Sequence, residues 1–209
     1  MTIKDIPIIQ GESVKLPTKY GHFDIIPFQE EQSGIEHMAL IKGDLSSQTN
    51  TLTRIHSACA TGDLFGSLKC DCGDQLIQAM SLIETKGHGL IVYLQQEGRG
   101  IGLMNKIKAY KLQEQGMDTI EANVHLGFLP DNRDYQVGAN ILNALGVNKI
   151  ELLTNNPDKI LGLEKNGIKV VKRVSLIIAP NPFNKHYLST KETRMGHLIN
   201  DKEIIKTGL

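Results

Sequence analysis

The sequence predicts an α/β (α+β) protein in which a mostly antiparallel N-terminal strand region precedes a C-terminal alternating α/β part, within one mixed β-sheet structure. Residues 14–56 contain short apolar stretches separated by turn residues, a pattern typical of antiparallel strands. From Asp74 the apolar period becomes helical, and strands then alternate with helices. We expect residues 1–209 to form a single domain with a polar, peripheral tail from about Lys191.

The N-terminal region contains three expected strands, at residues 14–29, 37–45 and 51–59. The next element is a helix over residues 74–87, where apolar side chains recur at helical spacing and Gly87 provides a stop. The remaining expected elements alternate: strand 89–96, helix 103–116, helix 135–145, strand 149–155, helix 156–167 and strand 168–177. Asn156 is the expected N-cap of the last helix, with Pro157 at its first position.

Composition excludes several classes of protein. Lys plus Arg and Asp plus Glu both total 23, so the basic excess typical of a nucleic-acid binder is missing, although a local basic patch for a small phosphorylated ligand remains compatible. The N-terminus lacks the apolar run of a signal peptide, and no stretch approaches the roughly 18 apolar residues of a membrane span. We therefore expect a cytoplasmic protein with neither nucleic acid nor membrane as a partner.

All three cysteines lie in one short stretch, with the pattern C-x10-C-x-C formed by Cys59, Cys70 and Cys72. Cytoplasmic thiols stay reduced, and thiolates suit zinc, so a metal site is a better interpretation than a disulfide. Three protein ligands leave one position open for water, which is typical of catalytic zinc. Gly73 is expected to allow a backbone conformation that a Cβ would resist.

Two other interpretations of the cysteines stay open at this point. They could be ordinary buried small residues, or a histidine such as His56 or His125 could close a structural zinc site.

Three further segments have both a structural and a functional interpretation. Residues 96–102 form a glycine-rich turn suited to an anion, 130–136 combine acids with Arg133, and 154–159 begin a helix with polar side chains.

Four segments together closely resemble the GTP cyclohydrolase II family: residues 54–76, 93–116, 118–142 and 152–160. They contain C-x10-C-x-C, QEGRG, DxRDY and TNNPxK in the family's order, within a resemblance that extends from about Leu16 to His197. The resemblance implies hydrolysis of GTP to formate, pyrophosphate and 2,5-diamino-6-(5-phospho-D-ribosylamino)pyrimidin-4(3H)-one, the first reaction of riboflavin biosynthesis. It also implies one catalytic zinc ion per subunit, magnesium with the triphosphate, and a homodimer.

The resemblance assigns roles to individual residues. Cys59, Cys70 and Cys72 match the zinc ligands, which would bind the water that attacks C8 of guanine. Asp131 matches the proposed proton acceptor, Arg133 the proposed nucleophile on the α-phosphorus, and Tyr110 a tyrosine near the reacting base. The implied GTP contacts are Arg54, Ile55, His56, Ser57, Ala58, Gln75, Glu97, Gly98, Arg99, Thr119, Thr154 and Lys159. A guanidinium has no free lone pair at neutral pH, so Arg133 could instead stabilise charge at phosphorus.

The chain departs from the family pattern at Ala58, Lys69 and Gln95, where many members have glutamate, arginine and arginine. We expect this chain to lack the dihydroxybutanone phosphate synthase domain that many members carry, and therefore to have one activity. Two alternatives remain: a catalytically inactive GTP-binding relative with structural zinc, and a structural-zinc nucleic-acid module. The matching Asp131, Arg133 and Tyr110 disfavour the first, and balanced charge disfavours the second.

Overall fold

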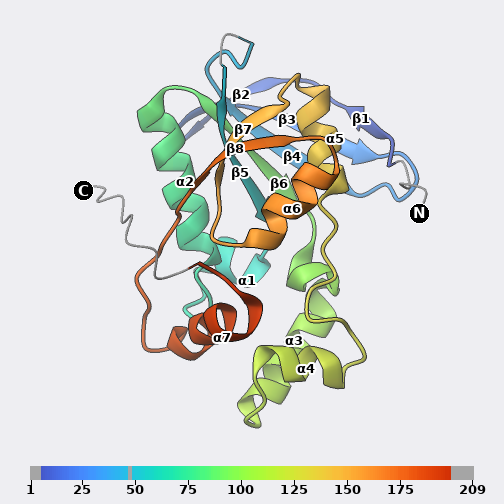
Figure 1. The fold of residues 1–209 in the computed structure, drawn as a ribbon, viewed down its shortest axis with the longest axis vertical. Coiled ribbons are helices and arrows are strands. Elements are labelled where there is room, and N and C mark those ends of the chain that lie inside the picture. Colours follow the sequence, from blue (N-terminus) through green and yellow to red (C-terminus); the bar gives the residue numbers. More distant parts are fainter. Residues whose placement is uncertain (1–5, 47–48, 199–209) are drawn as a thin grey trace.

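A single mixed sheet organises the computed structural model, which describes residues 6–46 and 49–198. The sheet has eight strands in the order β1-β3-β4-β6-β5-β7-β8, with β2 paired to β3 (Figure 1). The strands are β1 (Ile8–Gln10), β2 (Val14–Thr18), β3 (Gly21–Glu30), β4 (Glu36–Lys42), β5 (Thr51–Ser57), β6 (Gly89–Leu94), β7 (Lys149–Leu153) and β8 (Lys169–Val174). The helices are α1 (Ala60–Asp63), α2 (Cys72–Lys86), the 3-10 helix η1 (Glu97–Gly100), α3 (Gly102–Glu114), α4 (Thr119–His125), α5 (Gln136–Ala144), α6 (Pro157–Lys165) and α7 (Lys185–Met195).

Strand pairing changes from antiparallel to parallel at β6. This mixed sheet confirms the predicted fold class. Strands β1 to β4 pair antiparallel, and β4 pairs antiparallel with β6. Strand β5 pairs parallel with β6 on one side and with β7 on the other, and β7 pairs parallel with β8. Placing the 51–59 strand in the antiparallel region was therefore wrong. Thr51, Thr53, Arg54 and His56 are all buried, as is typical of a parallel strand that is covered on both faces.

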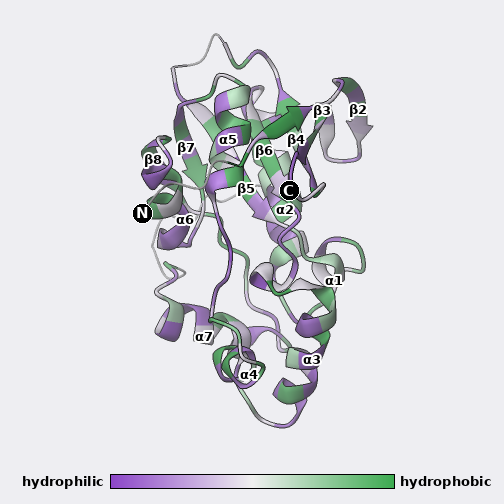
Figure 2. Cartoon of the chain, turned by 90° about the vertical axis from the view of Figure 1, so that its right-hand side faces the viewer, coloured by the Kyte–Doolittle hydropathy of each residue, from purple (hydrophilic) through white to green (hydrophobic). Residues whose placement is uncertain are grey.

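Helices cover both faces of the sheet and create two apolar clusters. Helices α5 and α6 pack on one face, where Phe28, Ile55 and Leu142 belong to the larger cluster. Helix α2 packs on the other face, where Met80 and Ile83 meet Phe23 and Ile91. In Figure 2 the central strands are largely green, whereas the lower helices carry more purple. Side chains from both faces thus fix the strands whose ends carry the site.

Local capping signals account for some of the helix boundaries. Gly87 adopts the left-handed conformation at the C-terminus of α2, and the Asn156 side chain accepts a hydrogen bond from the Asp158 N–H. Both predictions are confirmed. Helix α4 was not predicted, although Asp118 and Glu121 form a capping box at its start.

The C-terminal segment differs from the sequence expectation. Helix α7 was not predicted, and the peripheral placement of the chain from about Lys191 is wrong for Lys191 itself. That residue is 9% exposed and its ammonium group pairs with Asp71. The polar composition of this segment suggested that it is exposed to solvent. Lys191 is buried because Asp71 and the Tyr187 ring provide partners for its ammonium group. The part of the tail after residue 198 lies outside the described residues.

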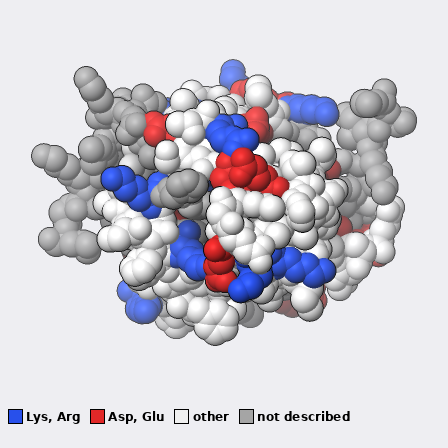
Figure 3. All heavy atoms as spheres, turned by 90° about the horizontal axis from the view of Figure 1, so that it is seen from below, with Lys and Arg blue, Asp and Glu red and all other residues white. Residues whose placement is uncertain are grey.

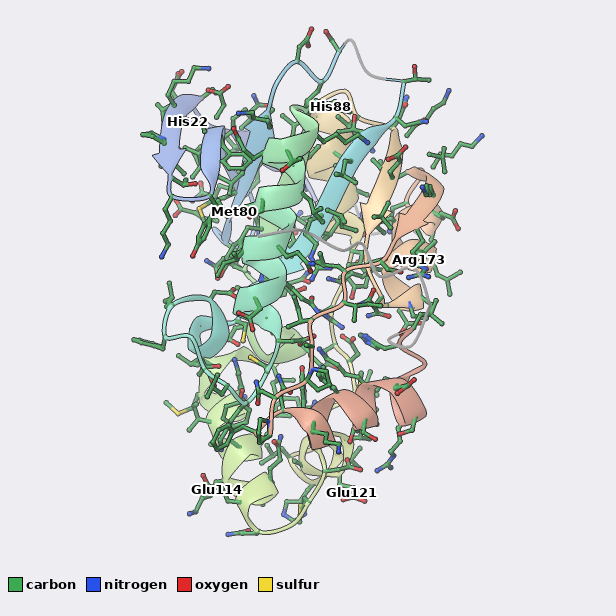
Figure 4. The ribbon with its side chains drawn as sticks, turned by 90° about the vertical axis from the view of Figure 1, so that its left-hand side faces the viewer. His22, Met80, His88, Glu114, Glu121 and Arg173 are labelled. Atoms are coloured by element: carbon green, nitrogen blue, oxygen red, sulfur yellow. The ribbon has the colours of Figure 1, made fainter. Side chains whose placement is uncertain are left out.

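The carboxyl ends of the parallel strands face a layer formed by α1, α3, α4 and α7, below the sheet in Figure 1. Figure 4 shows the same arrangement from another side, with Glu114 and Glu121 at the end of the molecule opposite His22 and His88. Ligands of open α/β sheets bind at such carboxyl ends. Of the described helices, none combines the length and apolar character needed to cross a membrane.

Candidate active site

The three cysteines meet at the boundary between the sheet and the lower helices. Cys59 follows β5 at the N-terminus of α1, Cys72 begins α2, and Cys70 lies in the turn between them. Their Sγ atoms all lie within 4.8 Å of one another, and those of Cys59 and Cys70 are 3.7 Å apart. Soft thiolate donors converging at this spacing fit a zinc-type ion.

Histidine does not close this cluster among the described residues. The group of potential metal ligands contains the three cysteines alone, with neither His56 nor His125. The His56 Nε2 instead lies 3.1 Å from Asp63 Oδ2, and His125 is exposed. The donor set therefore fits a site with one position left for another ligand.

Two glycines let the cysteine segments approach closely. A Cβ added to Gly62 would lie 2.9 Å from Cys70 Sγ and 3.2 Å from Cys59 Sγ. A Cβ on Gly73 would collide with the carbonyl oxygen of Gly62. The expectation that a Cβ at Gly73 would be resisted is therefore confirmed, and the cause is close backbone approach because Gly73 does not have a positive φ.

Asp63 holds the first cysteine in place, and sequence reasoning missed it. Its carboxylate accepts hydrogen bonds from the Cys59 N–H at 2.9 Å and from the Tyr93 hydroxyl at 2.8 Å. It also faces His56 Nε2, and the His56 ring stacks on Tyr93. An acceptor at Nε2 places the imidazole proton there, which leaves Nδ1 as an acceptor. The available sequence signal was an acid four residues after Cys59.

Lys106 is a second residue that the sequence analysis did not identify. Its ammonium group lies 3.1 Å from Cys59 Sγ and 2.8 Å from Glu97 Oε1. Burial opposes the charged form, but hydrogen bonds to Glu97 and Cys59 raise the pKa of Lys106. Hydrogen bonds from Cys70 and Cys72 lower the pKa of Cys59, and bonding to Cys59 raises the pKa of Cys70 to about 11. The cluster therefore holds a thiolate that a neighbouring cation stabilises.

The cysteines form one end of a cavity that gathers nearly all the expected site residues. Those that line it are Cys59, Cys70, Cys72, Arg54, His56, Ser57, Ala58, Gln75, Glu97, Gly98, Arg99, Tyr110, Thr119, Arg133, Thr154 and Lys159. Two expected residues do not line it. Ile55 is fully buried in the core, and Asp131 bonds Arg133, which does line the cavity. Lining residues that the sequence analysis missed include Lys106, Asn123, Tyr187, Lys191 and His197.

Charge inside this cavity contrasts with the balanced charge of the whole chain. Six Lys or Arg residues line it against one acidic residue, Glu97. Figure 3, which views the molecule from the end that holds α3, α4 and α7, shows basic and acidic side chains close together across the middle of that face. Such a concentration of cations favours an anionic ligand. The local basic patch that composition left open is present.

Unpaired polar atoms concentrate in the same place. In the described part of the chain, ten buried side-chain nitrogen or oxygen atoms have no hydrogen-bond partner, and six belong to residues that line the cavity. These six are Arg54 Nε, His56 Nδ1, Ser57 Oγ, Gln96 Oε1, one terminal nitrogen of Arg99 and Asn156 Nδ2. Buried polar groups normally have partners, so this concentration indicates a binding site for a polar ligand.

The glycine-rich segment after β6 forms a strained turn. Gly98 and Arg99 both have φ near +60°, and Arg99 is the only non-glycine residue with positive φ among residues 6–46 and 49–198. A side chain in this conformation costs about 1–2 kcal/mol. Gly100 packs so closely on Asn132 that a Cβ would lie 2.9 Å from its carbonyl oxygen. The strain therefore serves to aim Arg99 into the cavity.

Arg133 and Asp131 form a two-point ion pair, in which the guanidinium Nε lies 2.9 Å from Asp131 Oδ1 and a terminal nitrogen contacts Oδ2. Burial opposes ionisation of both groups, yet Tyr135 and Asp131 raise the pKa of Arg133, and Arg133 lowers the pKa of Asp131. Both groups are therefore charged at neutral pH. Burial raises the pKa of Tyr110 to about 12, so its phenol keeps its proton.

Arg54 and Lys159 are buried cations held by backbone oxygens. Arg54 donates to the Leu153 carbonyl at 2.9 Å, and Lys159 donates to the Ile55 carbonyl at 2.7 Å. Burial lowers the pKa of Arg54 to about 10, and burial and Arg54 lower the pKa of Lys159 well below its usual value. An anion placed between them would relieve this repulsion.

The three departures from the family pattern differ in position. Ala58 lines the cavity, and its N–H donates to the Leu94 carbonyl at 2.8 Å. Lys69 and Gln95 are exposed and do not line the cavity. Lys69 lies over the Tyr110 ring at 5.0 Å. Only the change at position 58 therefore alters a side chain that faces the cavity.

Comparisons with known proteins show the family to which the chain belongs. A family model described as GTP cyclohydrolase II matches residues 10–175. Riboflavin biosynthesis protein RibBA of Phocaeicola vulgatus is 56% identical over 191 residues, which are 91% of this chain and 47% of that protein. GTP cyclohydrolase-2 of Buchnera aphidicola is 51% identical over 190 residues, which are 91% of this chain and 98% of that protein.

The chain thus spans about half the length of the RibBA relatives that it matches and almost the full length of the Buchnera protein. Among solved structures, the crystal structure of RibBX from A. baumannii, a two-domain 3,4-dihydroxy-2-butanone 4-phosphate synthase, is 24% identical with a TM-score of 0.40 over 73% of this chain and 35% of that one. The matched span contains the cysteine cluster, Arg99 and Arg133, and it covers most of the sequence. The chain belongs to the GTP cyclohydrolase II family.

Proposed function

We propose that this chain hydrolyses GTP to formate, pyrophosphate and 2,5-diamino-6-(5-phospho-D-ribosylamino)pyrimidin-4(3H)-one, as the first reaction of riboflavin biosynthesis. The observation that carries the proposal is a cluster of three thiols at one end of a cavity lined by six cations, in a member of this family. Thiols can hold a Lewis-acidic ion, and cations can hold a triphosphate. One cavity therefore offers both groups that the reaction requires.

Cys59, Cys70 and Cys72 would hold a zinc ion. Zinc with three protein ligands supplies a Lewis acid that activates water near neutral pH. Lys106 neutralises charge on the Cys59 sulfur, and Asp63 fixes the Cys59 backbone. These two residues orient the donor set before any ligand arrives, as partners of metal ligands commonly do.

The cations would bind and orient the nucleotide. Arg54, Arg99 and Lys159 offset the charge of the triphosphate, which magnesium would accompany. Glu97 already accepts hydrogen bonds from the Ala60 and Gly98 N–H groups, so it shapes the wall beside the cysteines. Gln75 bonds Arg54, so it fixes that guanidinium toward the ligand. The unpaired donors and acceptors of the cavity would complete recognition of the base.

We assign Arg133 to charge stabilisation at the α-phosphorus. Asp131 grips its guanidinium, and the raised pKa keeps it protonated. A protonated guanidinium donates hydrogen bonds but has no lone pair for attack. Asp131 would then accept a proton only after its ion pair with Arg133 rearranges. The protonated phenol of Tyr110 would donate a hydrogen bond to the reacting base.

One assay tests the proposal. Purified protein with GTP, zinc and magnesium should release formate and pyrophosphate, and it should form a new pyrimidine chromophore. An inactive GTP-binding relative would bind GTP in calorimetry and release no formate. Cytoplasmic location and a homodimer remain part of the proposal, and sedimentation at several concentrations tests the second.

A further inference from the structure

Helix α7 reaches the site although it lies beyond the matched span, which ends at residue 175. Its side chains contact three separate elements. Tyr187 meets Arg99 of η1, Lys191 pairs with Asp71 between two cysteines, and Arg194 pairs with Asp118 at the start of α4. Figure 4 shows Glu121 of α4 beneath this helix. Helix α7 is therefore joined to the cavity wall by side chains along its length.

A continuous relay of side chains runs from Lys191 to β7. Lys191 Nζ lies 2.8 Å from Asp71 Oδ1, and Asp71 Oδ2 accepts from Gln75 Nε2 at 2.5 Å. Gln75 Oε1 in turn accepts from a terminal nitrogen of Arg54 at 2.6 Å. The other terminal nitrogen of Arg54 donates to the Leu153 carbonyl at 2.9 Å. Each polar group in this relay orients the next one.

Asp71 connects the relay to the cysteine cluster because it lies between Cys70 and Cys72 in the sequence. Its side chain is 6% exposed and that of Lys191 is 11% exposed, so this ion pair is largely withdrawn from water. Removing one partner of such a pair leaves an uncompensated buried charge, which forces the structure to rearrange. Rearrangement of Asp71 would move the turn that carries both sulfurs.

Tyr187 fixes the other side of the lysine. Its ring centroid lies 4.5 Å from Lys191 Nζ and 5.7 Å from Arg99 Cζ. Cations over an aromatic face are attracted to it. Lys191 is thus held between an aromatic ring and a carboxylate, which leaves its ammonium group little freedom.

We propose that Lys191 is a positioning residue that fixes the Cys70–Asp71–Cys72 turn through Asp71 and fixes Arg54 through Asp71 and Gln75. The metal part of this inference stands on the geometry alone. The part that concerns catalysis rests on the proposed function.

The first test measures metal binding in Lys191→Met, Lys191→Arg and the control Lys185→Met. Lys185 also lies on α7, but it is exposed. Competition with a chromophoric chelator gives the zinc dissociation constant, and thiolate-to-metal bands of the cobalt-loaded protein report ligand geometry. Loss of a residue that orients metal ligands weakens metal binding by about 10- to 100-fold, which we expect for Lys191→Met. Lys191→Arg should regain most of that loss, and Lys185→Met should match wild type.

A wild-type zinc affinity and cobalt spectrum in folded Lys191→Met would overturn the proposal. An equal loss of zinc affinity in Arg194→Met would also overturn it, because that variant loosens α7 from α4 without touching Asp71. If Lys191→Met does not fold, Lys191→Gln keeps a donor for Asp71 and should show a smaller loss. An unchanged affinity in that variant overturns the proposal as well.

A double-mutant cycle with Asp71→Asn tests the relay directly. If Lys191 acts through Asp71, the double variant should lose little more zinc affinity than Asp71→Asn alone. Losses that simply add would contradict the relay. Steady-state kinetics then separate the two effects proposed for Lys191. Displacement of the Cys70–Asp71–Cys72 turn should lower kcat, whereas displacement of Arg54 should raise the KM for GTP. A wild-type protein that releases no formate would refute the proposed function while leaving the zinc measurements valid.

Discussion

The two halves of the sheet are built from similar apolar strands but differ in what they carry. None of the described residues in β1 to β4 lines the cavity, whereas β5 alone contributes Arg54, His56 and Ser57 to it. Parallel strands bring their carboxyl ends to one edge of the sheet, and antiparallel strands alternate. The parallel half therefore concentrates loops and helix starts at one place. The described strands of the antiparallel half contribute residues to the apolar core but none to the lining of the cavity.

The largest expected effect lies in the parallel half. Cys70→Ser should bind zinc weakly and release formate at least about 10³-fold more slowly, because the Lewis acid contributes several kcal/mol to the reaction. Metal analysis and a formate assay measure both losses, and thermal unfolding of the metal-free proteins serves as the control. Formate release at the wild-type rate would remove the metal from the proposed mechanism.

A core substitution in the antiparallel half should give the opposite result. Phe28 is 1% exposed and belongs to the larger apolar cluster, so Phe28→Ala should lower the free energy of unfolding by about 3–5 kcal/mol. The folded fraction should keep the wild-type KM and zinc content. Urea unfolding followed by active-site titration checks this, and an altered KM would show that the two halves are coupled.

An intermediate effect is expected at Arg133. Arg133→Lys keeps the charge but loses the two-point grip of Asp131, so pyrophosphate release should slow by about 10- to 100-fold. Zinc content should not change, because Arg133 lies outside the cysteine cluster. Single-turnover assays measure the rate. A nucleotidyl adduct seen by mass spectrometry in wild type and missing in this variant would favour covalent attack over charge stabilisation.

The smallest effect is a proton linkage at Lys159. Burial and Arg54 lower its pKa in the free protein, and a bound polyphosphate should raise it again. The complex then holds more protons than the free protein, so affinity should fall as pH rises through the lowered pKa, by at most about tenfold per pH unit. Calorimetry with tripolyphosphate in buffers of different ionisation enthalpy measures the uptake. Lys159→Met should abolish it, and an unchanged uptake would assign the proton elsewhere.

Local signals in the sequence account for much of the fold. Gly87 and Asn156 end and begin helices through contacts within a few residues, so their roles follow from the chain itself. The direction of β5 depends on its neighbours in space, and the short apolar stretches separated by turn residues gave the wrong expectation for it. The capping box of α4 was present in the sequence but its short helix was not recognised.

In the site, too, local sequence signals were recognised and contacts between distant parts of the chain were not. The cysteine spacing raised a metal site beside two other interpretations, and the structure brings the three sulfurs together. The resemblance supplied Arg54 and Lys159, whose positions depend on strands far apart in the sequence. Lys106 and Lys191 were missed because each is one of two or more lysines in its helix, and only tertiary structure shows that these two are buried near the cysteines.

The crowding of like charges around the cavity has a consequence for the protein as a material. Mutual repulsion among Arg54, Arg133 and Lys159 strains the folded chain whenever the cavity contains no counter-ion. Inorganic phosphate or pyrophosphate that binds only the native form should therefore raise the melting temperature, and the increase should grow with the logarithm of the anion concentration above its dissociation constant. A buffer that contains phosphate or pyrophosphate should therefore keep the purified protein folded for longer than a buffer without these anions.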